Sequence, residues 1–348
     1  MRVGIVGTGA IAAKHALAYR NIGFDVVACT NATQTKGQQF ADENGAVFVS
    51  TVEELCNHPL VDYVDVCTFP SFRLPVVELC AQSKKHVLVQ KPMTIDLPTA
   101  DKMISLADDA GIQLGVVSQH RFDESTLFLK RAIQEGRLGR ILEADAYIKW
   151  YRTAEYYSRP AKGSWAVEGG GALMNQGIHQ VDLLLYLIGP VLYLSGEWQL
   201  SGLHSIESED LINVAFHYAS GAMGVIQAST ALWPGYSERI EIHGTNGTAI
   251  VVGDKLANWD VKNDAGEPPP PIAAQGASGA SDPMAISTVA FERQFLDFAK
   301  ACQEGRRPAC SGEDGRRALQ FVLGAYESCR TQRRITLTDS VEDPETDS

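Results

Sequence analysis

Residues 2–12 read RVGIVGTGAIA, an apolar run followed by the spacing G-x-G-x-x-A at Gly7, Gly9 and Ala12. A segment with helical periodicity comes directly after it, so the glycines lie at the turn between a strand and a helix. In such a turn the first glycine permits a tight bend, the second lets the backbone approach a pyrophosphate, and the small third residue allows close packing. The helix N-terminus faces the phosphates. This stretch therefore predicts a dinucleotide-binding β-α-β unit.

Apolar runs and helical segments continue to alternate up to residue 118. The further runs are DVVACT, AVFV, VDYVDVC, HVLVQ and IQLGVVS. Nearly continuous apolar strands between helices are typical of a parallel sheet that is covered on both faces. Residues 1–119 are therefore predicted to form an α/β, doubly wound Rossmann domain.

The pattern changes after residue 119. Helices are expected at 123–136 and 173–188, and between and after them strands follow one another with hairpin turns at SGAMG and GTNGT. Residues 120–335 are therefore predicted to be a substrate-binding α+β domain with a large, mostly antiparallel open sheet. It ends in helices at 288–303 and 313–332.

Two segments lack the apolar residues that a packed core requires. Residues 264–283 are rich in Pro, Gly, Ala and Ser, which predicts a mobile loop or a lid over a substrate. Residues 336–348 are predicted to be a disordered tail.

Composition narrows the classes of function. The chain of 348 residues has a formal net charge of −12, which disfavours binding to nucleic acid or to an anionic membrane. Its longest apolar run, LLLYLIG, is too short to cross a bilayer. The seven cysteines are odd in number and lack CxxC spacing, so we expect reduced core cysteines, no metal site and a cytoplasmic protein.

Two further patterns suggest chemistry. The run HVLVQ ends at Lys91 and Pro92, where the ligand crevice of a doubly wound sheet lies, and proline would hold the lysine in place. The alternative is a strand-end lysine that pairs with an acid. In EGGGALMNQGIHQVD, Asn175, His179 and Asp182 share one helical stripe, and by spacing alone this stripe could serve catalysis, capping, structure or a metal.

Together, GTGAIA, QKP and GGGALMNQGIHQVDLL resemble the glucose-fructose oxidoreductase and inositol dehydrogenase family (Gfo/Idh/MocA), over residues 1–335. The resemblance implies hydride transfer between NAD(P) and a carbinol carbon of a sugar, sugar derivative or cyclitol. It maps the catalytic lysine to Lys91 and the catalytic histidine to His179. Relatives with this fold also include glycosidases that recycle their cofactor and non-catalytic dinucleotide-sensing regulators, and relatives commonly form homo-oligomers, here expected as a dimer or tetramer.

The chain departs from the family pattern at Asn175 and Gln90, where the family usually has carboxylates. We expect Lys91 and His179 to hold their protons less tightly without these charges. His179 can act as base or acid, and Lys91 can stabilise a developing oxyanion. Asn175 is expected to orient the substrate by hydrogen bonds.

The end of the second strand lacks the acidic residue that would bind the ribose diol of NAD. Thr30, Asn31 and Lys36 could donate to a 2′-phosphate, although Lys36 could equally be a surface lysine, and the prediction leans to NADP over NAD. The predicted cofactor contacts are Gly7, Thr8, Gly9, Ala10, Ile11, Thr30, Asn31, Lys36, Thr68, Pro70, Gln90 and Lys91.

Sugars present apolar faces to aromatic rings and hydroxyls to polar groups, and an acidic sugar would favour arginine. The predicted substrate contacts are Arg121, Lys149, Tyr151, Trp165, Asn175 and His179. Tyr156 and Arg159 in EYYSRP are further candidates. Apart from Asn175 and His179, each of these residues could equally belong to ordinary packing or to the surface.

Overall fold

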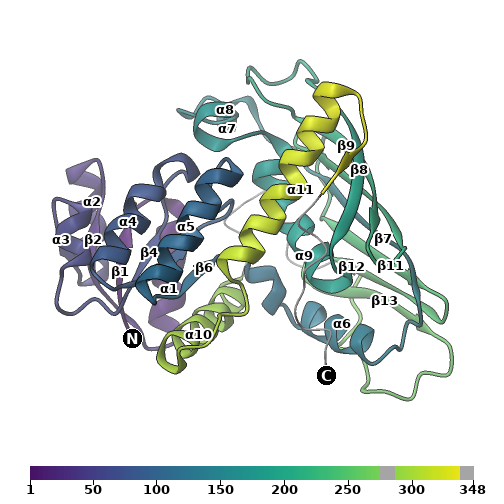
Figure 1. Ribbon diagram of the computed structural model, residues 1–348, viewed down its shortest axis with the longest axis horizontal. Coiled ribbons are helices and arrows are strands. Elements are labelled where there is room, and N and C mark those ends of the chain that lie inside the picture. The colour runs from purple at the N-terminus through teal and green to yellow at the C-terminus, as the bar shows by residue number, and fades with distance from the viewer. Residues whose placement is uncertain (275–286, 338–348) are drawn as a thin grey trace. The chain divides into compact units, whose positions relative to one another are not determined.

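The computed structural model describes residues 1–274 and 287–337, which form two compact units (Figure 1). Unit 1 comprises residues 1–119 and 287–316, and unit 2 comprises the other described residues. This division differs from the predicted one, which assigned all of 120–335 to the second domain. The difference lies in residues 287–316, which return to unit 1.

Unit 1 contains a six-stranded parallel sheet with the order β3-β2-β1-β4-β5-β6, which confirms the predicted Rossmann fold. Its strands are β1 (Arg2–Val6), β2 (Asp25–Thr30), β3 (Val47–Phe48), β4 (Tyr63–Val66), β5 (His86–Val89) and β6 (Leu114–Val116). Every residue of β4 is buried, as expected for a strand that is covered on both faces. The strand order reverses between β1 and β4, and ligands of such sheets bind at this switch point.

The helices of unit 1 follow the periodic segments of the sequence. They are α1 (Ala10–Asn21), α2 (Gln34–Asn44), α3 (Val52–Cys56), α4 (Leu74–Gln82), α5 (Leu97–Ala110) and α10 (Val289–Glu304), with a 3₁₀ turn η1 (Pro70–Phe72). A second 3₁₀ turn, η2 (Gln119–Phe122), spans the boundary with unit 2.

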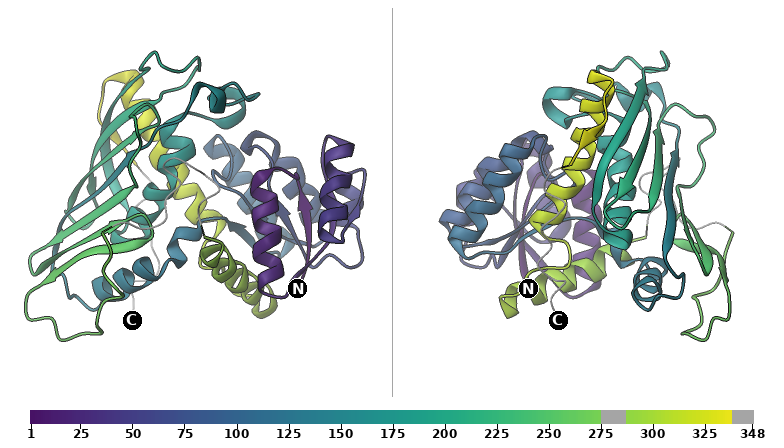
Figure 2. Two further views of the ribbon diagram at one scale, coloured as in Figure 1. Left: turned by 180° about the vertical axis from the view of Figure 1, so that it is seen from behind. Right: turned by 45° about the vertical axis from the view of Figure 1, so that its right-hand side comes forward.

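Helix α10 joins unit 1 because its aromatic residues complete the core beside α1 (Figure 2). The Tyr19 ring stacks on Phe295 with centroids 4.3 Å apart, and the His15 ring lies 5.2 Å from Phe291. Phe295 and Phe298 are almost fully buried. Periodicity predicts α10 as a helix, but it carries no information about which sheet the helix covers.

Unit 2 contains an eight-stranded sheet with the order β13-β12-β11-β7-β10-β9-β8-β14. It is antiparallel except for the parallel pair β7 and β10, so the predicted mostly antiparallel sheet is confirmed. Its strands are β7 (Ile141–Lys149), β8 (Val191–Gln199), β9 (Leu211–Tyr218), β10 (Met223–Ser229), β11 (Arg239–Gly244), β12 (Gly247–Val252), β13 (Lys255–Val261) and β14 (Ile335–Thr336).

Helices cover one face of this sheet in both views of Figure 2. The helices of unit 2 are α6 (Glu124–Gln134), α7 (Ala154–Tyr157), α8 (Trp165–Glu168), the π-helical turn η3 (Leu173–Gly177), α9 (Ile178–Ile188) and most of α11 (Gly312–Thr331). Residues of β9 alternate between buried and less buried, because only one face of the sheet packs against helices.

The structure describes part of each of the two segments with few apolar residues. Asp264, at the start of the predicted loop 264–283, accepts two hydrogen bonds from Arg137 at 2.8 and 2.6 Å, so this end of the loop is held in place. Thr336 pairs with Tyr193 and Leu337 is buried, so order extends past the predicted start of the tail. The rest of both predictions, 275–283 and 338–348, lies outside the described residues.

None of the helices in the described residues has the length and apolar character needed to span a membrane.

Candidate functional site

The glycine turn after β1 leaves its backbone open. Gly7 has φ +90, and a Cβ there would lie 3.1 Å from Thr68 Cγ2, so both conformation and space favour glycine. Its N–H donates to Thr30 O at 2.9 Å. Gly9 is exposed, and a Cβ there would meet nothing within 4 Å. Ala10 and Ile11 follow as the first residues of α1, so the N-terminus of this helix is accessible to an anion.

Three buried hydroxyls at the same edge of the sheet have no hydrogen-bond partner among the described residues. They belong to Thr8, Thr68 and Ser71. Thr8 follows β1, Thr68 follows β4, and Ser71 lies in η1 just after Pro70. Buried polar groups are normally hydrogen-bonded, so these hydroxyls fit contact with a polar ligand such as a dinucleotide. Ser71 was not predicted, because a serine in a short turn carries no distinguishing sequence pattern.

The predicted donors to a 2′-phosphate, at and after the end of β2, differ in how freely their side chains could contact a ligand. Asn31 accepts from Thr8 N at 3.2 Å and donates to Thr33 O at 3.0 Å, so both ends of its amide are used. Thr30 is buried, with 4% of its surface exposed. Lys36 is exposed in the first turn of α2 and has no ion-pair partner among the described residues. Of the three predicted donors to a 2′-phosphate, Lys36 is therefore the most available.

A buried arginine holds the backbone on both sides of Lys91. The Arg73 guanidinium is 2% exposed and donates to the carbonyls of Gln90 and Pro92. It also donates to Thr68 O from Nη2 at 2.6 Å and from Nε at 3.1 Å. Burial lowers the pKa of Arg73 to about 9, which keeps it charged at neutral pH. Arg73 thus joins the ends of β4 and β5, a contact that no sequence pattern indicates.

Gln90 links the backbone of Lys91 to a buried polar group in unit 1. Its Oε1 accepts from Lys91 N at 3.2 Å, and its Nε2 lies 2.8 Å from His15 Nε2. If the amide donates there, His15 Nδ1 carries the proton and donates to Asp65 Oδ2 at 2.7 Å. Tyr19 donates to the same oxygen at 2.8 Å. Gln90 is 6% exposed, so this side chain orders its neighbours and offers little surface to a cofactor.

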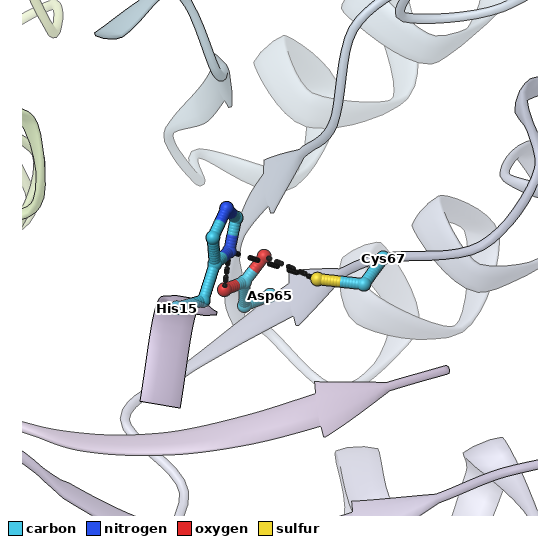
Figure 3. A group of neighbouring side chains, drawn as sticks. All are labelled: His15, Asp65 and Cys67. Carbon is cyan, nitrogen blue, oxygen red and sulfur yellow. Dashed lines mark hydrogen bonds and ion pairs between the residues drawn. The ribbon is translucent and has the colours of Figure 1, made fainter. Parts of the chain in front are cut away.

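His15, Asp65 and Cys67 are the one group of His, Cys, Asp or Glu side chains within residues 1–274 and 287–337 compact enough to share an ion (Figure 3). The short contact between His15 and Asp65 is a direct hydrogen bond. Burial, and then the Asp65 carboxylate, raise the pKa of the Cys67 thiol well above its usual value. A protonated thiol that donates to Asp65 suits a hydrogen-bonded cluster better than metal ligation, which requires a thiolate.

In unit 2, Asn175 and His179 lie on one half-buried stripe at the start of α9. The predicted helix at 173–188 begins as the π-helical turn η3, and such turns are frequent at functional sites. The glycines before it allow close packing: a Cβ at Gly171 would lie 1.8 Å from Glu209 O.

A buried carboxylate anchors this helix entry. Glu209 accepts from Gly171 N at 2.9 Å, from Leu173 N at 2.8 Å and from the Tyr326 hydroxyl at 3.0 Å. Burial raises the pKa of Glu209 to about 7, although these three hydrogen bonds act in the opposite direction. Glu209 therefore titrates close to neutral pH inside the core of unit 2.

A carboxylate also lies beside Asn175, which the sequence analysis did not predict. Asn175 Nδ2 donates to Glu168 Oε2 at 3.3 Å, and Glu168 also pairs with Lys162. Burial lowers the pKa of Lys162, but Tyr156 and Glu168 outweigh this effect and raise it overall. The negative charge that is missing at position 175 is thus present next to it. The sequence signal that could have identified Glu168 is its position directly before the three glycines 169–171.

His179 and Asp182 have different surroundings. The His179 ring meets the His120 ring edge-on with centroids 5.1 Å apart, and His120 Nδ1 lies 2.7 Å from Asp123 Oδ2. Asp182 is buried and accepts from Arg121 Nε at 2.8 Å and Nη2 at 2.6 Å. Arg121 is predicted to contact substrate, and in the structure it is buried and paired with Asp182.

The remaining predicted substrate residues are dispersed. Lys149 alternates with the buried inner-face residues of β7 and lies beside Tyr147 on the other face, which argues against contact with a substrate near α9. Trp165 donates to Glu207 O at 3.1 Å and packs against Tyr326. Tyr151 forms an isolated bridge with Ala231. Alternation of side chains along β7 could have placed Lys149 on the outer face of the sheet. The sequence did not show where this strand ends, so the alternation could not be extended to Lys149 with certainty.

Two family models match the chain. Residues 1–118 match the oxidoreductase family with an NAD-binding Rossmann fold, and residues 126–250 match the GFO/IDH/MocA C-terminal domain.

Known proteins are similar over nearly the whole chain. The myo-inositol 2-dehydrogenase of Thermotoga maritima is 25% identical over 350 residues, covering 98% of this chain and 100% of that protein. The 1,5-anhydro-D-fructose reductase of Ensifer adhaerens is 27% identical, covering 95% of this chain and 96% of that protein. The structure of the WlbA dehydrogenase from Bordetella pertussis, in complex with NADH and UDP-GlcNAcA, matches with a TM-score of 0.86 at 27% identity and covers 97% of both chains. The glycine turn, the strand order and these similarities together establish that the chain belongs to the Gfo/Idh/MocA family of oxidoreductases.

Proposed function

We propose that the protein is an NAD(P)-dependent dehydrogenase that acts on a carbinol carbon of a sugar, sugar derivative or cyclitol. The observation that carries this proposal is the open glycine turn, in a chain of this family, beside the hydroxyls of Thr8, Thr68 and Ser71. These buried hydroxyls have no hydrogen-bond partner in the part of the chain that the structure describes. These groups would hold the cofactor, with the pyrophosphate at the start of α1. The bound nicotinamide supplies or accepts the hydride.

The proton chemistry is assigned to two side chains of this protein. His179 takes the hydroxyl proton when an alcohol is oxidised and returns it when a ketone is reduced. Lys91 stabilises the negative charge that develops on the substrate oxygen. Asn175 orients the substrate, and Glu168 holds the Asn175 amide in place.

The test is turnover of a panel of sugars, sugar acids and inositols, followed by the absorbance of the reduced nicotinamide. Lys91→Ala and His179→Ala should each lower kcat by about 10²–10⁴-fold, and His179→Ala should retain cofactor binding, measured by fluorescence. Lys102→Ala is the matched control, because Lys102 is an exposed lysine paired with Glu78 in the same unit. Full activity of Lys91→Ala would contradict the assignment.

The same measurement separates the proposal from other activities of the family. A glycosidase that recycles its cofactor would release sugar without a net change in nicotinamide absorbance. A dinucleotide-sensing regulator would bind cofactor and leave the whole panel unchanged.

For the cofactor we propose a preference for NADP, supported by the absence of an acidic residue at the end of β2 and by the exposed Lys36. Lys36→Ala should raise the KM for NADP and leave the KM for NAD unchanged, because only NADP carries the 2′-phosphate. Lys102→Ala again serves as the control. An equal effect on both cofactors would remove Lys36 from the site.

We further propose a cytoplasmic homo-oligomer, in keeping with the seven free cysteines and the partly exposed face of the sheet in unit 2. Light scattering at several protein concentrations tests the oligomeric state.

A further inference from the structure

Three cationic side chains surround the ring of Tyr156 in unit 2. Their charged groups lie 5.5 Å (Arg152), 5.4 Å (Arg159) and 5.2 Å (Lys162) from the ring centroid. Arg152 is itself enclosed, because its guanidinium also lies 4.9 Å from the Trp150 ring. No continuous helix spans these positions, since α7 covers only Ala154–Tyr157. The fold of the connecting loops, and not helical spacing, therefore brings the cations together.

This cationic cluster is joined directly to the helix segment that carries His179. Gln176 Nε2 donates to the Tyr156 hydroxyl at 3.2 Å. Lys162 pairs with Glu168, which accepts from Asn175. Asn175 and Gln176 both belong to η3, the π-helical turn that leads into α9. The cluster thus adjoins the candidate catalytic stripe within unit 2.

Two neutral side chains at the cluster each have a buried polar atom without a hydrogen-bond partner among the described residues. One atom is the Gln176 side-chain oxygen, which belongs to the amide that contacts Tyr156, in a residue that is 7% exposed. The other is the indole nitrogen of Trp150, in a residue that is 6% exposed. Leaving a buried donor or acceptor unpaired is costly, so a polar ligand would stabilise both.

The charge of the cluster indicates the sign of that ligand. Glu168 offsets Lys162, but Arg159 is exposed and has no carboxylate partner within residues 1–274 and 287–337. Positive charge therefore exceeds negative charge around the Tyr156 ring, in a protein whose net charge is −12. An arginine fork with an adjacent ammonium suits a carboxylate or a phosphate group.

We propose that Arg159 and Lys162, beside Tyr156, bind an anionic group of the substrate, a carboxylate or a phosphate, so that the substrate is an acidic sugar derivative. The proposal rests on the proposed dehydrogenase function, whose reacting carbon lies at His179. The ring of Tyr156 provides a surface for the sugar, and the free oxygen of Gln176 accepts from a sugar hydroxyl. The cationic cluster then selects the substrate class, while Lys91 and His179 carry out the reaction.

The test compares matched pairs of compounds that differ only in charge, by calorimetric binding to the full-length protein saturated with NADP. Glucose is compared with glucuronate and with glucose 6-phosphate, and galactose is compared with galacturonate. At least one acidic member should bind about 10–100-fold more tightly than its neutral parent, as expected for a charge-assisted hydrogen bond. The carboxylate and phosphate arms show which anion is preferred. This preference should shrink as salt is added, because part of the site is exposed.

Arg159→Gln should remove most of the preference for the acid without changing NADP binding. It is the primary variant because Arg159 is exposed and its loss leaves no buried charge unpaired. Lys162→Met should act in the same direction, provided that its melting curve shows a folded protein. Arg140→Gln, another exposed arginine of unit 2, should leave the preference intact.

The outcomes separate this proposal from the dehydrogenase function. Selective binding of an acid that Arg159→Gln weakens, without any change in nicotinamide absorbance, would support the anion site and reject the dehydrogenase. Oxidation of neutral sugars as efficiently as their acids would support the dehydrogenase and overturn the anion site. Binding of none of the acids, or an undiminished preference in Arg159→Gln, would also overturn it.

Discussion

At the scale of single residues, buried charges do most to shape the candidate site. The Arg73 guanidinium donates to backbone carbonyls at the ends of β4 and β5, and it has no carboxylate partner within residues 1–274 and 287–337. A guanidinium can satisfy several carbonyls at once because it has five donors in a rigid plane. The backbone around Lys91 is therefore held by a side chain eighteen positions earlier in the sequence.

Arg73→Met should destabilise the protein by about 1–3 kcal/mol or more, because buried carbonyls lose their donor. Arg73→Lys should recover part of this stability but not the full contact, since an ammonium lacks the planar fork. Denaturant unfolding measures both, with Arg20→Met as the control at an exposed arginine of unit 1. Equal stability of Arg73→Met and wild type would show that water replaces the guanidinium.

Glu209 makes stability depend on pH. Its pKa is raised from 4.5 to about 7 in the folded state, so the folded protein binds more protons than the unfolded chain in this interval. Stability should therefore be highest below this interval and should fall as pH rises through about 7, by a total on the order of 3 kcal/mol from this residue. Unfolding midpoints at pH 5 and pH 8 should differ less in Glu209→Gln than in wild type.

Glu197→Gln is the control for this experiment, because Glu197 is an exposed carboxylate of unit 2. If wild type and Glu209→Gln had the same pH dependence, Glu209 would be ionised throughout and its three hydrogen bonds would outweigh its burial.

At the scale of elements, the sequence predicts what is periodic and misses what depends on distant contacts. The apolar runs at 2–6 and 63–66 predict buried strands, and the structure has the buried strands β1 and β4 there. The glycine spacing predicts the turn after β1. The sequence predicts an ordinary helix at the π-helical turn, because a change of backbone bonding from i→i+4 to i→i+5 leaves no mark on the apolar pattern. Glu168 beside Asn175 was missed for a related reason, since its partners are set by the turn and not by chain spacing.

The entry to α9 should tolerate no side chain at Gly171. Gly171→Ala places a Cβ against the Glu209 backbone and should cost about 1–3 kcal/mol or more, with a lower kcat because Asn175 and His179 follow this turn. Cofactor affinity should be unchanged, because the glycine turn of unit 1 is untouched.

Gly136→Ala separates a steric clash from the conformational preference of glycine. Gly136 has φ +71 and open space around its Cβ position, so only backbone strain of about 1–2 kcal/mol applies. Thermal melting and turnover of both variants test the difference. A smaller loss in Gly171→Ala than in Gly136→Ala would mean that the helix entry adapts.

At the scale of the whole molecule, the fold class follows from the order of strands and helices, but the division of the chain does not. The return of 287–316 to unit 1 depends on aromatic packing between α10 and α1, which a one-dimensional pattern cannot show. The candidate residues of each unit could be recognised through family motifs, whereas their buried supports, such as Arg73 and Glu209, became visible only in three dimensions.

A fragment that ends at Gln119 should therefore be less stable than the intact unit. Phe295 and Phe298 are 0% and 1% exposed in the protein, and each buried ring contributes about 1.5–3 kcal/mol. Adding a peptide of residues 287–316 to the fragment should raise its thermal midpoint, measured by circular dichroism. A peptide with both phenylalanines replaced by serine should have no effect. A fragment that melts identically with and without the intact peptide would contradict this prediction.

The discontinuity of unit 1 also has a consequence for biosynthesis. The ribosome produces the whole Rossmann sheet first, yet the helix that covers His15 and Tyr19 is translated some 170 residues later. During that interval the nascent chain exposes an aromatic surface, which is where a holding chaperone would bind.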